Sequence, residues 1–184
     1  MIGARINGGN TAYKRNESDY YPTPPEATQA LLDFLDIPRG TVIWEPACGE
    51  GHMVQVLERN RLKVIATDIQ GGTDFLTAEM PRNTEWIITN PPFSLAEQFI
   101  RKCAEHNKPF ALLLKSQYWH AAKRTPLYWE ITPEYVLPLT WRPDFLFKTR
   151  GKGAPLMDVI WCVWKPNATT TKYIPLSKPE LKEV

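Results

Sequence analysis

The hexapeptide TNPPFS, residues 89–94, places an amide side chain, two prolines and an aromatic ring directly after the apolar run WII. Proline has a fixed φ and no backbone N–H, so a Pro-Pro pair ends a strand in a rigid turn. The Asn90 side-chain oxygen and the Pro91 carbonyl are then two preorganised hydrogen-bond acceptors, and Phe93 adds a flat π-face. This turn can hold an amino group by both hydrogens, although the same residues also suit a plain strand-to-helix connection.

Upstream, polar residues follow two other predicted strands. EPACGEG, at 45–51, leaves the first strand through a turn whose glycines let a ligand approach the backbone, and Glu45 suits a cationic or polyhydroxyl ligand. Asp68 ends the next strand, where an acid can accept both hydroxyls of a ribose. Asp74 and Phe75 come next, and they can read an adenine amine and pack against its ring. Since ligands bind at the carboxyl ends of strands in open α/β sheets, we expect one site here.

Other site chemistries find little support in the sequence. EPACGEG is not a G-x-G-x-x-G turn, and no lysine supplies a phosphate-binding P-loop. Without a CxxC motif or a Cys/His cluster we expect no metal, and the odd, widely spaced cysteines indicate a reducing cytoplasm rather than a disulfide framework: Cys48, Cys103 and Cys162. We interpret the scattered histidines as surface or capping residues: His52, His106 and His120.

Strand-like and helix-like stretches alternate along the chain and position these residues. Strands are predicted at 41–46, 62–68, 85–90, 109–115, 134–141 and 157–164. Helices are predicted at 23–35, 52–60 and 94–106, with a broken helix at 116–131. Thr23 and Glu26 read as a capping box for the first helix. The order predicts an α/β fold with a mostly parallel twisted sheet, helices on both faces and an antiparallel edge strand.

Length and composition set the domain organisation. With 184 residues, 43% hydrophobic and 23% charged, the chain suits one globular domain, and no apolar run of about 18 residues predicts a membrane span. We expect a flexible arm at 1–18, a catalytic domain at 19–165 and an irregular tail at 166–184. No insertion is long enough to form a further domain. Three tryptophans in the last strands are expected to be packing residues: Trp141, Trp161 and Trp164.

In this order, the motifs resemble those of the S-adenosylmethionine-dependent N6-adenine DNA methyltransferases, particularly the small forms carried by phages and prophages. The resemblance covers about residues 19–164 and rests on DYYPTPPE, EPACGEG, TDI, DFL and NPPF. It implies a Rossmann-like class I methyltransferase fold, S-adenosylmethionine as cofactor, and double-stranded DNA with a flipped base as partner. Sequence-specific members of this family carry a separate target-recognition region, and this chain has no insertion long enough for a separate target-recognition domain. Recognition of the DNA sequence would therefore be short or relaxed.

The resemblance also implies roles for individual residues. The cofactor contacts, from the methionine end to the adenine end, would be Tyr21, Pro22, Thr23, Glu45, Ala47, Cys48, Gly49, Asp68, Ile69, Asp74 and Phe75. Cys48 would be a packing residue there, not a nucleophile. The catalytic residues would be Asn90, Pro91, Pro92 and Phe93. No strong base is needed, because the proton of the amine can leave after methyl transfer.

Basic and aromatic residues outside these motifs are candidates for contact with DNA: Lys14, Arg15, Lys115, Tyr118, Arg142, Lys148, Arg150 and Lys152. Two alternatives to DNA methylation stay open. Asn-Pro-Pro turns also suit methylation of RNA adenines or of a protein glutamine, although Phe93 in place of tyrosine leans toward nucleic acid. The chain could also be a non-catalytic, methyltransferase-like nucleic-acid-binding module, which intact Asn90 and Asp68 argue against.

Overall fold

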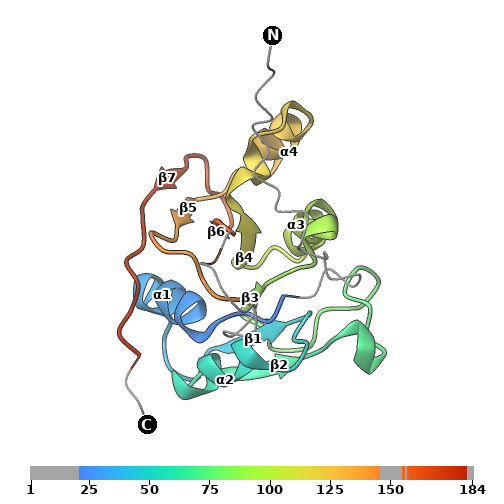
Figure 1. Ribbon diagram of the computed structural model, residues 1–184. Coiled ribbons are helices and arrows are strands. Elements are labelled where there is room, and N and C mark those ends of the chain that lie inside the picture. The colour runs from blue at the N-terminus through green and yellow to red at the C-terminus, as the bar shows by residue number, and fades with distance from the viewer. Residues whose placement is uncertain (1–20, 146–154, 156, 182–184) are drawn as a thin grey trace.

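A computed structural model describes residues 21–145, 155 and 157–181, and it contains one seven-stranded sheet in the order β2-β1-β3-β4-β6-β5-β7 (Figure 1). The strands are β1 (Val42–Glu45), β2 (Lys63–Ala66), β3 (Trp86–Thr89), β4 (Phe110–Lys115), β5 (Tyr135–Pro138), β6 (Val159–Trp164) and β7 (Lys172–Tyr173). Strands β1 to β4 pair in parallel, and β6 runs antiparallel to both of its neighbours. The predicted fold class is confirmed. One detail differs from the prediction of an antiparallel edge strand. The antiparallel strand β6 lies between β4 and β5, and β5 and β7 continue the sheet beyond it.

Helices cover both faces of this sheet. They are α1 (Pro25–Leu35), α2 (His52–Arg59), α3 (Ala96–Glu105) and α4 (Thr125–Glu130), with short 3-10 turns η1 (Ile69–Gly71), η2 (Phe93–Leu95), η3 (Ser116–Trp119) and η4 (Ala122–Arg124). The predicted broken helix is therefore the succession of η3, η4 and α4. Within the described residues no helix is both long enough and apolar enough to cross a membrane.

The central strands β1, β3, β4 and β6 are apolar on both faces, and each face has its own hydrophobic core. Ile43 and Leu113 point to the core under α1 and α2, whereas their neighbours Trp44 and Leu112 point to the core under α3. This alternation follows from the two-residue period of a strand. Burial on both faces explains why the strands read as nearly continuous apolar runs.

The start of α1 differs from the prediction. Pro24 is the N-cap residue, and no side chain caps the helix. Pro25 has no N–H to satisfy, and the N–H of Ala27 bonds to the Pro24 carbonyl at 3.0 Å. The predicted capping box of Thr23 and Glu26 was wrong, because the two prolines remove the need for it.

The chain after β6 is also more ordered than predicted. Lys172–Tyr173 forms β7, which pairs in parallel with β5, and Leu176 makes a further bridge to Leu139. The N–H of Lys172 bonds to the Glu134 carbonyl at 2.8 Å. This segment has no strong strand pattern of its own, so its pairing depends on the edge that β5 offers.

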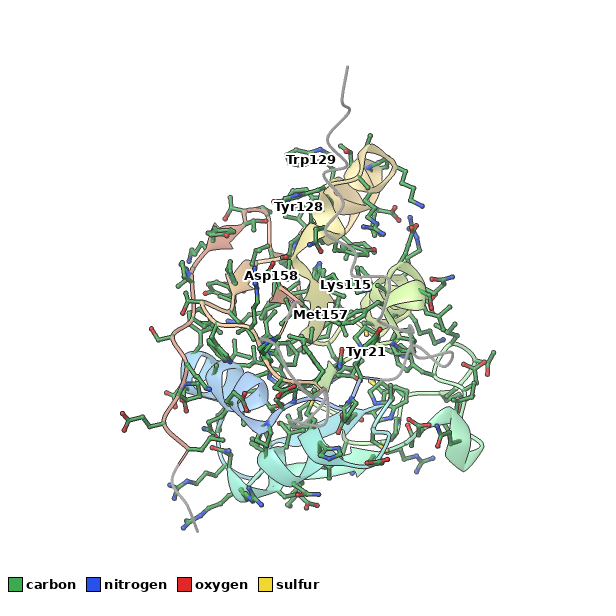
Figure 2. All side chains as sticks on the ribbon, in the orientation of Figure 1. Tyr21, Lys115, Tyr128, Trp129, Met157 and Asp158 are labelled. Carbon is green, nitrogen blue, oxygen red and sulfur yellow. The ribbon has the colours of Figure 1, made fainter. Side chains whose placement is uncertain are left out.

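Trp161 links the sheet to α1 and gives a test of the fold. Its fully buried ring donates a hydrogen bond from Nε1 to the Ala27 carbonyl at 2.8 Å. We expect Trp161→Phe to lower the free energy of unfolding by about 1–3 kcal/mol, because it removes this bond and leaves a small cavity. Trp129→Phe is the matched control, since Trp129 on α4 is 72% exposed (Figure 2). Urea unfolding followed by circular dichroism measures both, and equal stabilities would contradict the assignment.

Candidate active site

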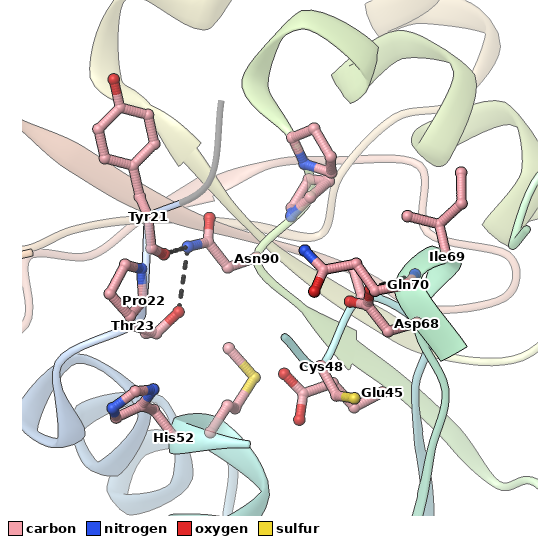
Figure 3. Close-up of a pocket in the computed structure, with 14 residues that line it drawn as sticks. Tyr21, Pro22, Thr23, Glu45, Cys48, His52, Asp68, Ile69, Gln70 and Asn90 are labelled. Carbon is pink, nitrogen blue, oxygen red and sulfur yellow. Dashed lines mark hydrogen bonds between the residues drawn. The ribbon is translucent and has the colours of Figure 1, made fainter. Parts of the chain in front are cut away.

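A pocket opens at the carboxyl ends of β1, β2 and β3, and four separate segments of the chain form its wall (Figure 3). The lining residues are Tyr21, Pro22, Thr23, Glu45, Ala47, Cys48, His52, Met53, Asp68, Ile69, Gln70, Asn90, Pro91 and Pro92. Parallel pairing of these strands sends their carboxyl ends to the same edge of the sheet. Four motifs that are distant in sequence therefore meet at one place.

The turn after β1 is held against the end of β2. The N–H of Gly49 donates to Asp68 Oδ2 at 2.8 Å, and the N–H of Gln70 donates to Asp68 Oδ1 at 2.9 Å. Gly49 and Gly51 both have positive φ, at 50° and 79°, which favours glycine. Each oxygen of Asp68 already accepts one backbone hydrogen bond, which fixes the carboxylate and leaves its remaining lone pairs for a ligand.

Glu45 places a second acid in the same pocket, in a different environment. It is only 2% exposed, and its Oε2 has no hydrogen-bond partner among the described residues. Burial, followed by the negative charge of Asp68, raises the pKa of Glu45 to about 8, against a smaller lowering by a hydrogen bond from the Val54 backbone. At neutral pH this carboxyl keeps its proton, and a cation entering the pocket would favour its ionised form.

The amide of Asn90 is held by the segment that precedes α1. Its Nδ2 donates to the Tyr21 carbonyl at 2.9 Å and to Thr23 Oγ1 at 3.0 Å (Figure 3). Its Oδ1 is buried and has no partner in the described part of the chain. A buried carbonyl oxygen without a donor costs free energy, which an incoming N–H group would recover.

An aromatic and a cationic side chain lie near Tyr21, whose carbonyl holds this amide. The ring of Phe93 lies 5.5 Å from that of Tyr21, centroid to centroid. Lys115, the last residue of β4, places its Nζ 4.7 Å from the centroid of the Phe93 ring. Phe93 and Lys115, both predicted site residues, therefore contact each other, but neither is among the residues that line the pocket.

Three of the predicted cofactor residues are not among those that line the pocket: Gly49, Asp74 and Phe75. Phe75 is 3% exposed and packs in the core, 5.1 Å from Trp44 and 4.7 Å from Phe99 between ring centroids. Asp74 accepts a hydrogen bond from the Leu76 N–H at 3.0 Å, which closes a local turn. The Phe75 ring is therefore a core residue, whereas Asp74 is exposed and its predicted contact with a base stays a prediction.

The predicted DNA contacts are only partly accounted for. Tyr118 is buried, with the Arg124 guanidinium 4.0 Å from its ring centroid, so it presents no surface to DNA. Arg142 forms an exposed ion pair with Asp158 at 2.7 Å. Five of the predicted contacts lie outside the described residues: Lys14, Arg15, Lys148, Arg150 and Lys152.

Three residues that line the pocket were not predicted from the sequence: His52, Met53 and Gln70. His52 is the first residue of α2, so its place directly after the glycine turn was the available signal. His106, by contrast, stands at the end of α3, where partial burial lowers its pKa. No group of three or more acidic, cysteine or histidine side chains that could hold a metal ion occurs within the described ranges.

Comparison with known proteins places the fold. No protein-family model matches the chain. A type II methyltransferase of Mycoplasma genitalium is 39% identical over 54 residues, which are 28% of this chain and 17% of that protein. The chain thus matches only a small part of this relative's length.

Solved structures match over most of the chain. A Listeria monocytogenes protein assigned to the class I S-adenosylmethionine-dependent methyltransferases has a TM-score of 0.58 at 12% identity, covering 91% of this chain and 69% of that one. A type I restriction-modification methyltransferase subunit from Streptococcus thermophilus has 0.58 at 14%, covering 84% and 47%. The 23S rRNA methyltransferase ErmE has 0.52 at 11%, covering 82% and 71%. The chain has the class I methyltransferase fold, as its motifs implied.

The raised pKa of Glu45 predicts that the folded protein becomes less stable as the pH rises. Glu45 keeps its proton up to about pH 8 in the folded protein, whereas its ordinary pKa is 4.5. Between these values the folded state binds more protons than the unfolded state, so raising the pH lowers the free energy of unfolding. We expect this group to cost about 2–3 kcal/mol of stability between about pH 6 and about pH 9.

Urea unfolding at both pH values measures this loss. Glu45→Gln is expected to remove it, because the amide does not titrate. Glu58→Gln, at an exposed position on α2, is the matched control and should keep the wild-type pH dependence. Parallel curves for wild type and Glu45→Gln would contradict the raised pKa.

Proposed function

We propose that this chain is an S-adenosylmethionine-dependent methyltransferase that transfers the methyl group to the N6 amine of adenine in DNA. The observation that carries the proposal is the Asn90 amide, whose nitrogen donates to Tyr21 and Thr23 and whose buried oxygen has no donor among the described residues. An oxygen in this state accepts a hydrogen bond from an amino group. The class I methyltransferase fold and the order of the motifs support the reaction type.

Several residues of the pocket suit individual parts of S-adenosylmethionine. Bound there, the cofactor would supply an electrophilic methyl group on a sulfonium. Glu45, with its unpartnered oxygen, suits the positively charged methionine end, and Asp68 suits the ribose hydroxyls. Ile69 is 70% exposed at the rim, where its side chain can cover the adenine ring.

Catalysis then depends on what the chain does to the acceptor amine. The lone pair of an adenine amine is delocalised into the ring, so the amine is a poor nucleophile. Hydrogen bonds from its two hydrogens to Asn90 Oδ1 and to the Pro91 carbonyl favour a pyramidal nitrogen and aim the lone pair. Phe93 supplies a surface for the base, which must leave the duplex to enter the site. The proton leaves after the methyl group has transferred.

Removing the Asn90 amide tests the proposed mechanism. We expect Asn90→Ala to lower kcat at least about 100-fold, the typical effect of removing one preorganised hydrogen-bonding group from an active site. Cofactor affinity should change little, because Glu45 and Asp68 remain. Transfer of a tritiated methyl group to duplex DNA, with digestion to nucleosides and detection of N6-methyladenine, measures the reaction.

The same assay with RNA and with a glutamine-containing protein distinguishes the alternative acceptors. Methyl transfer to either of these in preference to DNA would overturn the DNA assignment but keep the reaction type. No transfer to any acceptor, together with retained binding of DNA, would favour a non-catalytic binding module.

Lys115 gives a separate test of the DNA partner. Its ammonium group stands over Phe93 at the carboxyl edge of the sheet, whereas Lys108 precedes β4 at the opposite edge. If Lys115 contacts phosphate, Lys115→Met weakens DNA binding and reduces the slope of log affinity against log salt by about one. Lys108→Met is the matched control and should bind as wild type. Equal affinities and slopes for the two variants would exclude the contact.

A further inference from the structure

We infer that Thr23 is a positioning residue for the Asn90 amide and joins the cofactor-binding segment to the acceptor site. The inference rests on the proposed function and concerns a residue whose expected roles were helix capping and cofactor contact. It starts from the two hydrogen bonds that leave Asn90 Nδ2. The amide nitrogen has two hydrogens, and the Tyr21 carbonyl and the Thr23 hydroxyl take one each.

The two partners of Asn90 constrain it in different ways. A carbonyl oxygen can only accept, so the Tyr21 carbonyl, 2.9 Å from Nδ2, decides which end of the amide faces it. A flipped amide would set two oxygens against each other with no hydrogen between them. The Thr23 hydroxyl can donate or accept and so does not select the end. Its contribution is the second hydrogen bond, which fixes the rotation of the amide plane and therefore the direction of Oδ1.

Thr23 is itself rigid and is free of the role that its sequence position suggested. It stands between Pro22 and Pro24, and a residue before proline is restricted to extended backbone. Its β-branched side chain has few rotamers and is 5% exposed. Because Pro24 and Pro25 start α1 without a side-chain cap, the hydroxyl is left to bond Asn90.

The segment that holds the Asn90 amide also forms one wall of the pocket. Tyr21, Pro22 and Thr23 line it together with Glu45 and Asp68. A shift of this segment would move the cofactor wall and the Asn90 amide together. The geometry therefore couples the placement of the methyl donor to the aim of the acceptor oxygen, through the Thr23 hydroxyl and the Tyr21 carbonyl.

The test compares Thr23→Val, which keeps the shape and loses the hydroxyl, with Thr23→Ser, which keeps the hydroxyl. At saturating cofactor and DNA, we expect kcat of Thr23→Val to fall about tenfold and that of Thr23→Ser to stay within about twofold of wild type. Unchanged kcat in Thr23→Val, with only a weaker KM for the cofactor, would overturn the inference and leave Thr23 as a binding residue.

A second readout does not depend on activity. The side-chain NH₂ signals of Asn90, assigned in a nitrogen-15 NMR spectrum by their loss in Asn90→Ala, report both hydrogen bonds. In Thr23→Val one of the two hydrogens should shift upfield and exchange faster, and Thr23→Ser should restore it.

If wild type transfers no methyl group, the proposed function fails, whereas this spectrum still decides the contact. Identical signals in wild type and Thr23→Val would overturn it. If Thr23→Val does not fold, Thr23→Ala replaces it.

Discussion

The parallel pairing of β1 with both β2 and β3 is the constraint on which the site depends. The registers, with Trp44 opposite both Ile65 and Ile87, bring three strand ends to one edge of the sheet. Each strand then turns away at a different motif, so residues more than twenty positions apart share one pocket. The hydrogen bond from Gly49 to Asp68 closes the first turn against the second strand end. If these strands were not parallel, the motifs would not lie at the same edge of the sheet.

Within that pocket, local environment gives similar side chains different properties. Asp68 accepts two backbone N–H groups, whereas one oxygen of Glu45 accepts none among the described residues and burial raises the pKa of its carboxyl. The amide of Asn90 shows the same principle within one side chain, since its nitrogen is satisfied and its oxygen is not. Glu45 Oε2 and Asn90 Oδ1, which have no partner among the described residues, are the atoms to which the proposed ligands would bond. The hydrogen-bonding groups of the site are thus arranged before any ligand binds.

Much of this arrangement could be predicted from the sequence, because strand burial and motif order are local signals. The apolar runs gave the strands, and strand-end residues such as Glu45, Asp68 and Asn90 lie together as expected. The details that failed depend on tertiary contacts. Thr23 reads as a helix cap until Asn90 is placed next to it, and Phe75 reads as a ligand contact until Trp44 and Phe99 take its ring. Tyr118 reads as a surface residue until it is found buried.

Strand β2 ends the sheet, and this position has a consequence for the lifetime of the pocket. It is paired on one side only, and its four residues are half-buried or exposed. A short strand with few buried apolar contacts is expected to have lower local stability than the central strands. Asp68 follows β2 directly, so each transient separation of β2 from β1 also breaks the link to Gly49. A ligand that contacts both the turn after β1 and the turn after β2 would oppose this separation. The time that such a ligand stays bound would then depend on how often β2 separates from β1.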